Sequence, residues 1–144
     1  MLDLVAPPIE EMLNRVTALL PPAAPSALNA EIGPFYDTAG VATLLGGVSK
    51  QAVADRRKKH TILAVKTSDG RWAYPTFQFT GNDVDPALVP AIQAFRSAPA
   101  WSAALWFVTP NPDLDEATPL EWAHSERSAQ ALVTSAGRTA HEWQ

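Results

Sequence analysis

The sequence predicts a mainly α-helical protein in which a pair of short helices and one β-hairpin precede a small C-terminal helical domain. Three observations carry this prediction: apolar residues recur at helical spacing, an Asp-Gly turn separates two β-forming runs, and Thr-Pro-Leu-Glu marks a helix start. The 144 residues, 47% of them hydrophobic, suffice for one domain or two very small ones. We expect three parts, at residues 1–34, 35–80 and 81–144.

The first part is predicted to contain a short amphipathic helix at residues 8–20, followed by a Pro/Ala-rich linker at 21–34 that has no clear period. The acidic N-terminus lacks the basic start of a signal peptide, and no apolar run approaches the roughly 18 residues of a membrane-spanning helix. The chain contains no Cys, which excludes disulfides, thiolate catalysis and Cys-ligated zinc. We therefore expect a soluble cytoplasmic protein that has no membrane partner.

Two short helices separated by Gly46 and Gly47 are predicted within residues 37–59. Asp37 or Thr38 has the side chain of an N-cap for the first helix, and Ser49 for the second. The residues expected to face inward are Val41, Ala42, Leu44, Leu45, Ala52 and Val53.

Residues 61–75 have strand character on both sides of a turn at residues 67–70, and its Asp-Gly pair is typical of a β-hairpin. Phe77 and Phe79 are expected to anchor the return of the hairpin to the core. The helical period resumes from Gly81. The residues that carry this period are Leu88, Ile92 and Phe95, then Trp101, Leu105 and Val108, and finally Ala129, Leu132, Val133, Ala136, Ala140 and Trp143. Thr118–Glu121 is a capping box with Pro at the first helical position.

Charge is strongly segregated along the chain. Residues 50–71 contain seven of the eleven Lys and Arg residues but only two acidic residues, so this segment carries a local +5 while the remainder sums to −9. Such a basic segment in an acidic protein indicates a polyanion site on one small surface. A solvated basic face is the alternative.

The basic segment coincides with a pattern that resembles the helix-turn-helix of bacterial regulators. The pattern consists of Ala42, Leu45, Gly46, Val48, Ser49, Ala52 and Val53, in which the small Ala permits close helix approach and Val48 fills the space between the helices. The hairpin that follows as a wing makes the resemblance closer to MerR-like modules. The second glycine makes the turn one residue longer than usual.

This resemblance implies that residues 49–59 form a recognition helix for double-stranded DNA. Lys50 and Gln51 would reach guanine and adenine, and the basic residues would contact phosphates. The predicted DNA-binding residues are Ser49, Lys50, Gln51, Ala54, Arg57, Lys58, Lys59 and Arg71. The alternative is a module whose basic helix meets protein or solvent.

No constellation in the sequence indicates catalysis. His60 lies within the basic segment, and Glu121 with His124 has a spacing found in carboxylate-bridged metal sites, but the further ligands of such sites cannot be assembled. The chain lacks a Gly-rich phosphate loop and a nucleophile elbow. We therefore expect a binding protein, without metal or cofactor, and not an enzyme.

An aromatic and acidic stretch near the C-terminus carries a second resemblance. The chain resembles the C-terminal module of the Xre/MbcA/ParS antitoxin family over roughly residues 85–143, in the order and spacing of Trp101, Leu105-Trp106, Thr109-Pro110-Asn111, Leu114 and Thr118–Glu121. In that family a helix ending in Trp and an apolar residue leads into a Pro-Asn loop and a capped helix. Its DNA-binding half is all-helical, whereas this one is predicted to be winged.

The resemblance implies an antitoxin that neutralises a RES-domain, NAD-consuming toxin and represses its own operon by binding operator DNA. An acidic surface would complement a toxin whose active-site mouth binds the NAD pyrophosphate, and Trp143 could plug that cleft. The predicted toxin-binding residues are Trp106, Asn111, Asp113, Leu114, Asp115, Glu116, Trp122 and Trp143. We expect a homodimer or a toxin–antitoxin hetero-oligomer. The alternative is a MerR- or excisionase-like regulator whose C-terminal helices dimerise.

Overall fold

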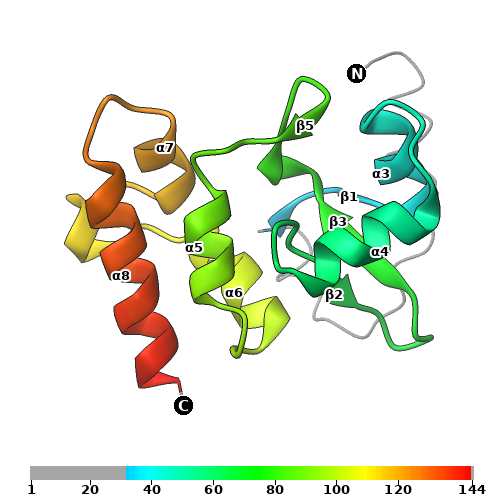
Figure 1. Ribbon diagram of the computed structural model, residues 1–144. Helices are drawn as coiled ribbons and strands as arrows, with labels where there is room; N and C mark the ends of the chain where they lie inside the picture. The colour runs from blue at the N-terminus through cyan, green and yellow to red at the C-terminus, as the bar shows by residue number, and fades with distance from the viewer. Residues whose placement is uncertain (1–31, 144) are drawn as a thin grey trace.

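The structure is a computed structural model and describes residues 32–143. The helix predicted at 8–20 and all but the end of the linker predicted at 21–34 lie outside the described residues. Figure 1 shows the pair α3 and α4 on one side, helices α5 to α8 on the other, and the β-strands between them. The helices are α3 (Thr38–Leu44), α4 (Lys50–Lys58), α5 (Val89–Ala94), α6 (Ala100–Phe107), α7 (Pro119–Ala123) and α8 (Ala129–Glu142). The strands are β1 (Phe35–Tyr36), β2 (Val65–Lys66), β3 (Trp72–Pro75), β4 (Phe79–Thr80) and β5 (Asp83–Val84), and two 3-10 turns are η1 (Thr76–Gln78) and η2 (Pro112–Leu114).

Helices α3 and α4 begin where their capping residues predict. The Asp37 carboxylate accepts the Gly40 backbone N–H at 2.6 Å, and the Ser49 hydroxyl accepts that of Ala52 at 3.0 Å. Each bond satisfies one of the donors that the first turn of a helix leaves unpaired. Gly46 and Gly47 then connect the helices with φ angles of 100° and 83°, a left-handed conformation that favours glycine.

The role predicted for Val48, to fill the space between the two helices, is wrong, because its side chain is 38% exposed. The two-glycine turn is the reason. The backbone N–H groups of Gly47 and Val48 both donate to the Ala42 carbonyl, at 2.9 and 3.1 Å, and the turn carries Val48 to the surface. The space is filled instead by Val41 and Val53, which are both fully buried.

The predicted hairpin is present, and it belongs to a three-stranded antiparallel sheet of order β1-β3-β2. Strand β1, which the sequence analysis did not identify, pairs with the far end of β3, so that Phe35 lies opposite Pro75. Two residues are too few to show the alternation that marks a strand. On the other edge of β3, Lys66 lies opposite Trp72, which brings these two side chains to one face.

The helix predicted to resume from Gly81 begins only at Val89, because residues 79–84 form a second antiparallel ribbon of β4 and β5. Gly81, with a φ of 63°, occupies the first position of the two-residue turn, where glycine is favoured. Pro86 then disfavours a helical conformation for the residue before it. The glycine turn and Pro86 therefore decide where the helix begins, and the spacing of apolar residues does not.

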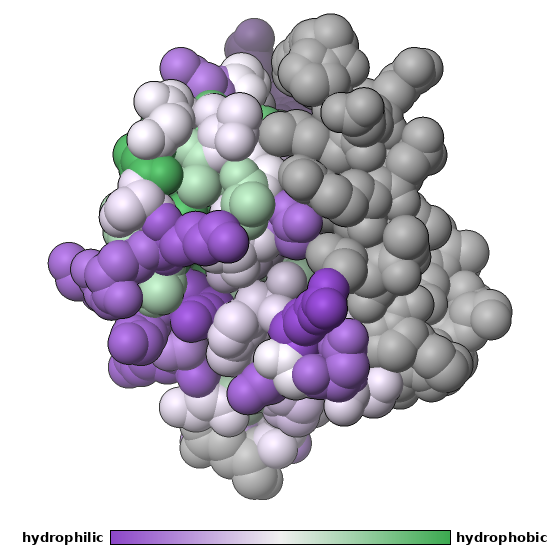
Figure 2. Space-filling view, turned by 90° about the vertical axis from the view of Figure 1, so that its right-hand side faces the viewer, coloured by the Kyte–Doolittle hydropathy of each residue, from purple (hydrophilic) through white to green (hydrophobic). Residues whose placement is uncertain are grey.

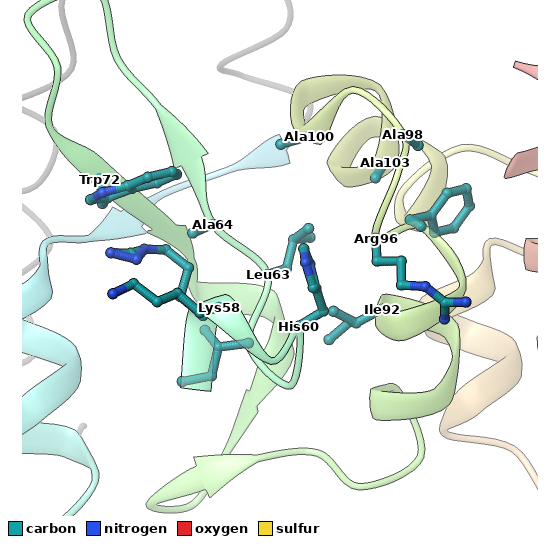
Figure 3. A pocket seen from close by; sticks show the side chains of 13 residues that line it. Lys58, His60, Leu63, Ala64, Trp72, Ile92, Arg96, Ala98, Ala100 and Ala103 are labelled. Carbon is teal, nitrogen blue, oxygen red and sulfur yellow. The ribbon is translucent and has the colours of Figure 1, made fainter. Parts of the chain in front are cut away.

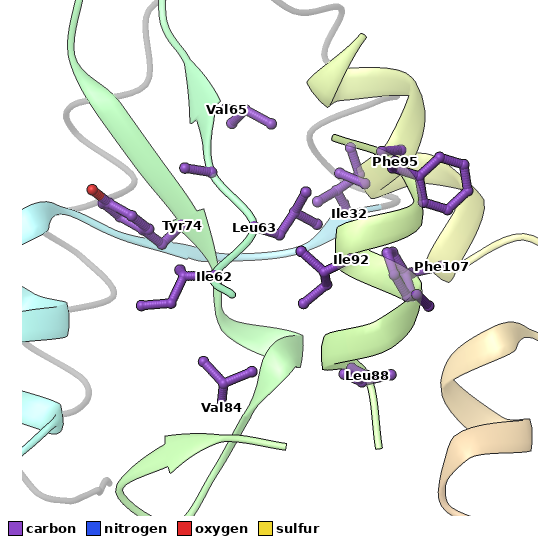
Figure 4. Packing of buried hydrophobic residues seen from close by; sticks show 14 of the residues in the cluster. Ile32, Ile62, Leu63, Val65, Tyr74, Val84, Leu88, Ile92, Phe95 and Phe107 are labelled. Carbon is purple, nitrogen blue, oxygen red and sulfur yellow. The ribbon is translucent and has the colours of Figure 1, made fainter. Parts of the chain in front are cut away.

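One hydrophobic core extends across the predicted domain boundary between residues 80 and 81. The ring of Phe35 lies edge-on to that of Trp101 at 5.8 Å, and Phe77, one of the two predicted anchors, packs on Phe107 at 5.8 Å. The Trp101 indole N–H also donates to the Lys66 carbonyl at 3.2 Å. Figure 4 shows apolar side chains of the sheet region and of α5 and α6 gathered in this shared core. The helical part therefore supports the hairpin directly.

The C-terminal helices follow the sequence signals closely. The Thr118 hydroxyl accepts the Glu121 N–H at 3.1 Å while the Glu121 carboxylate accepts the Thr118 N–H at 2.8 Å, which completes the predicted capping box. Helix α8 begins after Ser128, whose hydroxyl caps the N–H of Ala131.

A buried amide fixes the segment between α4 and β2. Gln78 is fully buried; its side chain accepts the Leu63 N–H at 2.8 Å and donates to the carbonyls of Leu63, at 2.8 Å, and Pro75, at 3.0 Å. These bonds satisfy polar groups that water cannot reach. They hold the approach to β2 against η1, which closes the hairpin.

We predict that Gln78→Met, which keeps the length of the side chain but removes its polar atoms, lowers the free energy of unfolding by about 2–4 kcal/mol, because it leaves buried backbone groups of Leu63 and Pro75 unpaired. Urea denaturation measures this. Gln130→Ala on the exposed face of α8 is the control and should change stability by no more than about 0.5 kcal/mol. A Gln78→Met protein as stable as this control would contradict the role of the amide.

Candidate nucleic-acid interface

Cationic side chains from α4 and the hairpin converge on one groove. The groove has a volume of about 480 Å3, and its residues come from the start of α3, one face of α4, and β3 with the residue that precedes it. Lys50, Gln51, Ala54 and Arg57 line it from the helix, and Arg71 and Trp72 line it from the hairpin. Five of the eight predicted DNA-binding residues are therefore brought together in one depression.

Trp72 positions the groove's central cation. The Arg57 guanidinium carbon lies 4.2 Å from the centre of the indole ring, and the Lys66 ammonium lies 5.2 Å from it. Both distances are within the range of cation–π attraction, which holds a cation without neutralising its charge. Arg57 is thus ordered and remains positive. Trp72 is not among the predicted DNA-binding residues, because its contact with Arg57 joins a strand to a helix and leaves no local pattern in the sequence.

Arg56, the residue before Arg57 on α4, forms an ion pair outside the groove. Arg56 forms an ion pair with Asp83 of β5, with 2.8 Å between guanidinium nitrogen and carboxylate oxygen. This bond ties α4 to the second ribbon. Adjacent arginines on one helix therefore have different surroundings: Arg56 is neutralised by a carboxylate, and Arg57 lines the groove.

The polar residues at the start of α4 are partly pre-organised. The Gln51 side-chain N–H donates to the Asp55 carboxylate one helical turn later, at 2.9 Å. This bond uses one amide hydrogen and leaves the other, together with the amide oxygen, for a further partner. Ser49 serves as the N-cap of α4 and does not line the groove.

The remaining predicted DNA-binding residues, Lys58 and Lys59, lie at the C-terminal end of α4 and are exposed, outside the groove. Figure 2 views the side of the molecule that holds α3 and α4, and hydrophilic side chains cover much of the described surface there. Lys50 and Arg57 therefore line the groove, Arg56 pairs with Asp83, and Lys58 and Lys59 lie at the end of the helix.

A network of hydrogen bonds shapes the hairpin tip. The buried Thr67 hydroxyl bonds to the Asp69 carboxylate and accepts the Arg71 N–H, and Asp69 also lies 3.4 Å from the Arg71 guanidinium. The bond from Thr67, assisted by the charge of Arg71, lowers the pKa of Asp69 below its ordinary value. Gly70, with a φ of 83°, completes the turn. The network holds Arg71 in place at the end of the β2–β3 turn.

Four of the residues predicted to bind a toxin are structural. Trp106, Asn111, Leu114 and Trp122 are all buried. The Asn111 amide donates to the Ser135 hydroxyl at 3.0 Å, and the Trp122 indole N–H donates to the Ser128 carbonyl at 2.8 Å. These residues hold the loop between α6 and α7 on α8, and Leu114 pins that loop to the core as its pattern predicts.

The other four residues of that set are exposed. Asp113 forms an ion pair with Arg138 of α8, 2.9 Å apart, whereas Asp115 and Glu116 have left-handed φ angles of 56° and 66°. Non-glycine residues adopt that conformation only where the surrounding structure enforces it. Trp143 is 40% exposed, and its ring lies 5.5 Å from that of Phe95. It therefore caps the core at its edge.

Within residues 32–143, no three His, Asp or Glu side chains lie close enough together to hold a metal ion. The predicted pattern of Glu121 and His124 is used otherwise: Glu121 completes the capping box, and His124 bonds to Asp85 at 2.9 Å. No helix of the described residues is long and apolar enough to span a membrane.

Comparison with known proteins gives one similar solved structure and no family. No family model matches the chain, and no curated protein matches it. The NMR structure of Rv2175c is similar, with a TM-score of 0.60 and 25% sequence identity, over 85% of this chain and 85% of that chain. The chain therefore shares the fold of Rv2175c.

We predict that Asp69 titrates below the ordinary range of an aspartate, because Thr67 and Arg71 stabilise its charged form. A depressed pKa stabilises the folded state above the unfolded pKa of about 3.9, and this contribution is lost as the pH falls through the folded pKa. A carbon-detected NMR titration measures the midpoint. Thr67→Val should move that midpoint up toward the ordinary value. An Asp69 that titrates normally in the unaltered protein would contradict the network.

Proposed function

We propose that the protein binds double-stranded DNA, with the α3–α4 pair acting as a helix-turn-helix and the β2–β3 hairpin as its wing. The observation that carries the proposal is the groove in which Lys50, Gln51 and Arg57 of α4 face Arg71 of the hairpin tip. A helix and a wing that present cations to one depression form the arrangement by which winged modules hold a duplex. The fold shared with Rv2175c is compatible with this use.

The charges in the groove suit phosphate contacts. Within residues 32–143, neither Arg57 nor Lys50 forms an ion pair with a carboxylate, so in this part of the chain both cations can contact a phosphate. Neutralising phosphates releases counterions from the duplex, and affinity then falls steeply with salt. Among the described residues that line the groove, Asp37 supplies a carboxylate, which accepts the Gly40 N–H as a helix cap.

Base contacts would come from the first turns of α4. Gln51 retains one amide hydrogen and its oxygen beyond the bond to Asp55, the pair of groups that recognises adenine in the major groove. Lys50 is exposed beside it and has the donor that guanine accepts. Ala54, one turn later on the same lining face, leaves room for the approach of the base edges.

A second proposal concerns the C-terminal part, which we infer acts as an antitoxin module toward a RES-domain toxin. The observation that favours it is the loop after η2, where Asp115 and Glu116 are exposed in a conformation imposed by the packing of Asn111 and Leu114 beneath them. A rigid acidic projection complements a basic active-site mouth. The competing use of these helices is dimerisation of a plain DNA-binding regulator.

We predict that Arg57→Gln weakens binding to a duplex of about 20 base pairs roughly 5-fold at low salt and reduces the slope of log affinity against log salt by about 1. Fluorescence anisotropy at several salt concentrations measures both quantities. The control is Arg56→Gln, on the neighbouring residue that pairs with Asp83, which should change the affinity by less than about 2-fold. Equal losses in the two variants, or no binding by the unaltered protein, would remove the support for the groove.

For the second proposal, the toxin encoded beside this gene should co-purify with the protein, and the double change Asp115→Asn with Glu116→Gln should slow their association at least about 5-fold at low salt. Surface plasmon resonance measures the rate. Glu126→Gln, an exposed carboxylate outside the loop, is the matched control. A protein that forms only homodimers and retains no toxin would favour the plain regulator.

A further inference from the structure

A second cavity lies on the other side of Arg57 and Trp72. It has a volume of about 330 Å3 and is formed by the end of α4, the segment leading into β2, β3, α5 and the start of α6. Figure 3 shows His60 between the strand side, with Trp72 and Ala64, and the helical side, with Ile92 and Arg96. The volume is at the lower end of the range of small-molecule sites. This cavity has no part in the proposed DNA contacts except through the two residues that it shares with the groove.

The lining combines an apolar interior with nitrogen-bearing side chains. Leu63, Ile92 and Phe95 provide much of the apolar wall, and the nitrogen-bearing groups come from Arg57, Lys58, His60 and Arg96. Among residues 32–143, no carboxylate lines the cavity, and neither Lys58 nor Arg96 forms an ion pair. Such a lining combines cationic groups that attract an anion with apolar walls that can contact an apolar body.

One buried donor in this wall has no partner. The Arg57 Nε is inaccessible to water and has no hydrogen-bond partner in the part of the chain that the structure describes. Native proteins leave few buried donors unpaired, and each such group calls for an explanation. The cation–π contact with Trp72 holds the guanidinium but does not satisfy Nε. Because Nε is inaccessible in this conformation, an acceptor in the cavity would pair with it only when the guanidinium turns toward the cavity.

The backbone at His60 adds an independent observation. Its φ is 59°, and it is the residue after the C-cap of α4, where the N–H groups of His60 and Thr61 bond back to the carbonyls of Arg57 and Arg56 at 3.0 Å each. Glycine is the residue favoured at this position of a helix end. A histidine there accepts a conformational cost, and strained residues of this kind gather at ligand sites. Its imidazole lines the cavity.

We propose that this cavity binds a small carboxylate with an apolar body, held by the cationic rim and by His60. An arginine guanidinium pairs with a carboxylate through two parallel hydrogen bonds, and the walls formed by Leu63, Ile92 and Phe95 exclude water from the rest of the molecule. A fully polar anion would leave these walls without contacts. The ligand class is therefore an amphipathic carboxylate.

The site is coupled to the groove, an extension that rests on the proposed DNA binding. Arg57 and Trp72 line both depressions, so together they form the wall between them. A carboxylate that draws Arg57 toward the cavity removes a cation from the groove. Each ligand therefore weakens the other's binding by the same factor, as thermodynamic linkage requires.

Binding is tested without DNA, by amide chemical-shift mapping with benzoate, 3-phenylpropionate and 4-phenylbutyrate, each beside its neutral amide. Shifts should cluster at residues 57–64 and 95–103 and strengthen with the length of the apolar body. The amide should bind roughly tenfold more weakly than its acid, the factor for the loss of one charge-assisted hydrogen bond. Absence of clustered shifts with all three acids, or equal binding of acid and amide, would overturn the proposal.

Two variants separate binding from folding. Arg96→Gln changes an exposed side chain that forms no ion pair within residues 32–143, and it should weaken binding of the carboxylate roughly tenfold with unchanged thermal stability. His60→Gly should leave the fold at least as stable, because glycine relieves the left-handed backbone, and should also weaken binding. A His60→Gly protein that binds 4-phenylbutyrate as tightly as the unaltered chain would contradict the role of the imidazole.

Coupling is measured separately, with saturating 4-phenylbutyrate in the DNA titration. The duplex should bind the unaltered protein at least about 3-fold more weakly, and the Arg96→Gln protein, which is less occupied at the same concentration, should show a clearly smaller change. A carboxylate that binds the cavity while duplex affinity stays constant would overturn the coupling. If no duplex binds at all, the DNA proposal fails, and the result of the shift mapping still stands.

Discussion

The positions of α4 and the β2–β3 hairpin, which together form the groove, depend on one buried amide, that of Gln78. Gln78 bonds to both backbone groups of Leu63 and to the Pro75 carbonyl, and so joins the segment that leaves α4 to the turn that closes the hairpin. Because no water reaches these groups, the alternative to the three bonds is unpaired polar backbone in the core. The relative position of α4 and β3 follows from this constraint, and with it the shapes of the groove and the adjoining cavity.

The contact between Arg57 and Trp72 provides an ordered cation in the groove, which makes the groove a candidate site for an anion. The indole orders the guanidinium by an attraction that leaves its charge uncompensated, whereas Asp83 neutralises the adjacent Arg56. The wall formed by Arg57 and Trp72 serves two depressions of different character, one open and polar, the other partly apolar. In the two proposals, one ordered cation, Arg57, would contact a DNA phosphate on one side of the wall and a small carboxylate on the other.

The sequence predicted the features that depend on local chemistry. The caps at Ser49 and Thr118 and the Asp-Gly turn each need only a few neighbouring residues, and each is present in the structure. The exposure of Val48 and the β4–β5 ribbon were missed, because glycine conformations there outweigh the apolar period. Trp106 and Trp122, which were predicted to bind a toxin, are buried in the structure. The spacing of aromatic residues in a sequence does not distinguish one that binds a partner from one that fills the core. Trp72 holds Arg57 only because the folded chain places strand β3 beside α4, and a contact between two separate elements is not visible in the sequence.

The central claim is that a duplex is held in the groove between α4 and the hairpin tip, and amide chemical-shift mapping with a short DNA duplex tests it most directly. The account predicts that the largest changes fall at Lys50, Gln51, Ala54 and Arg71, and that they vanish at high salt. Residues 113–116, on the acidic loop, should not respond. Changes confined to α7 and α8, or no change at α4 at low salt, would contradict the account.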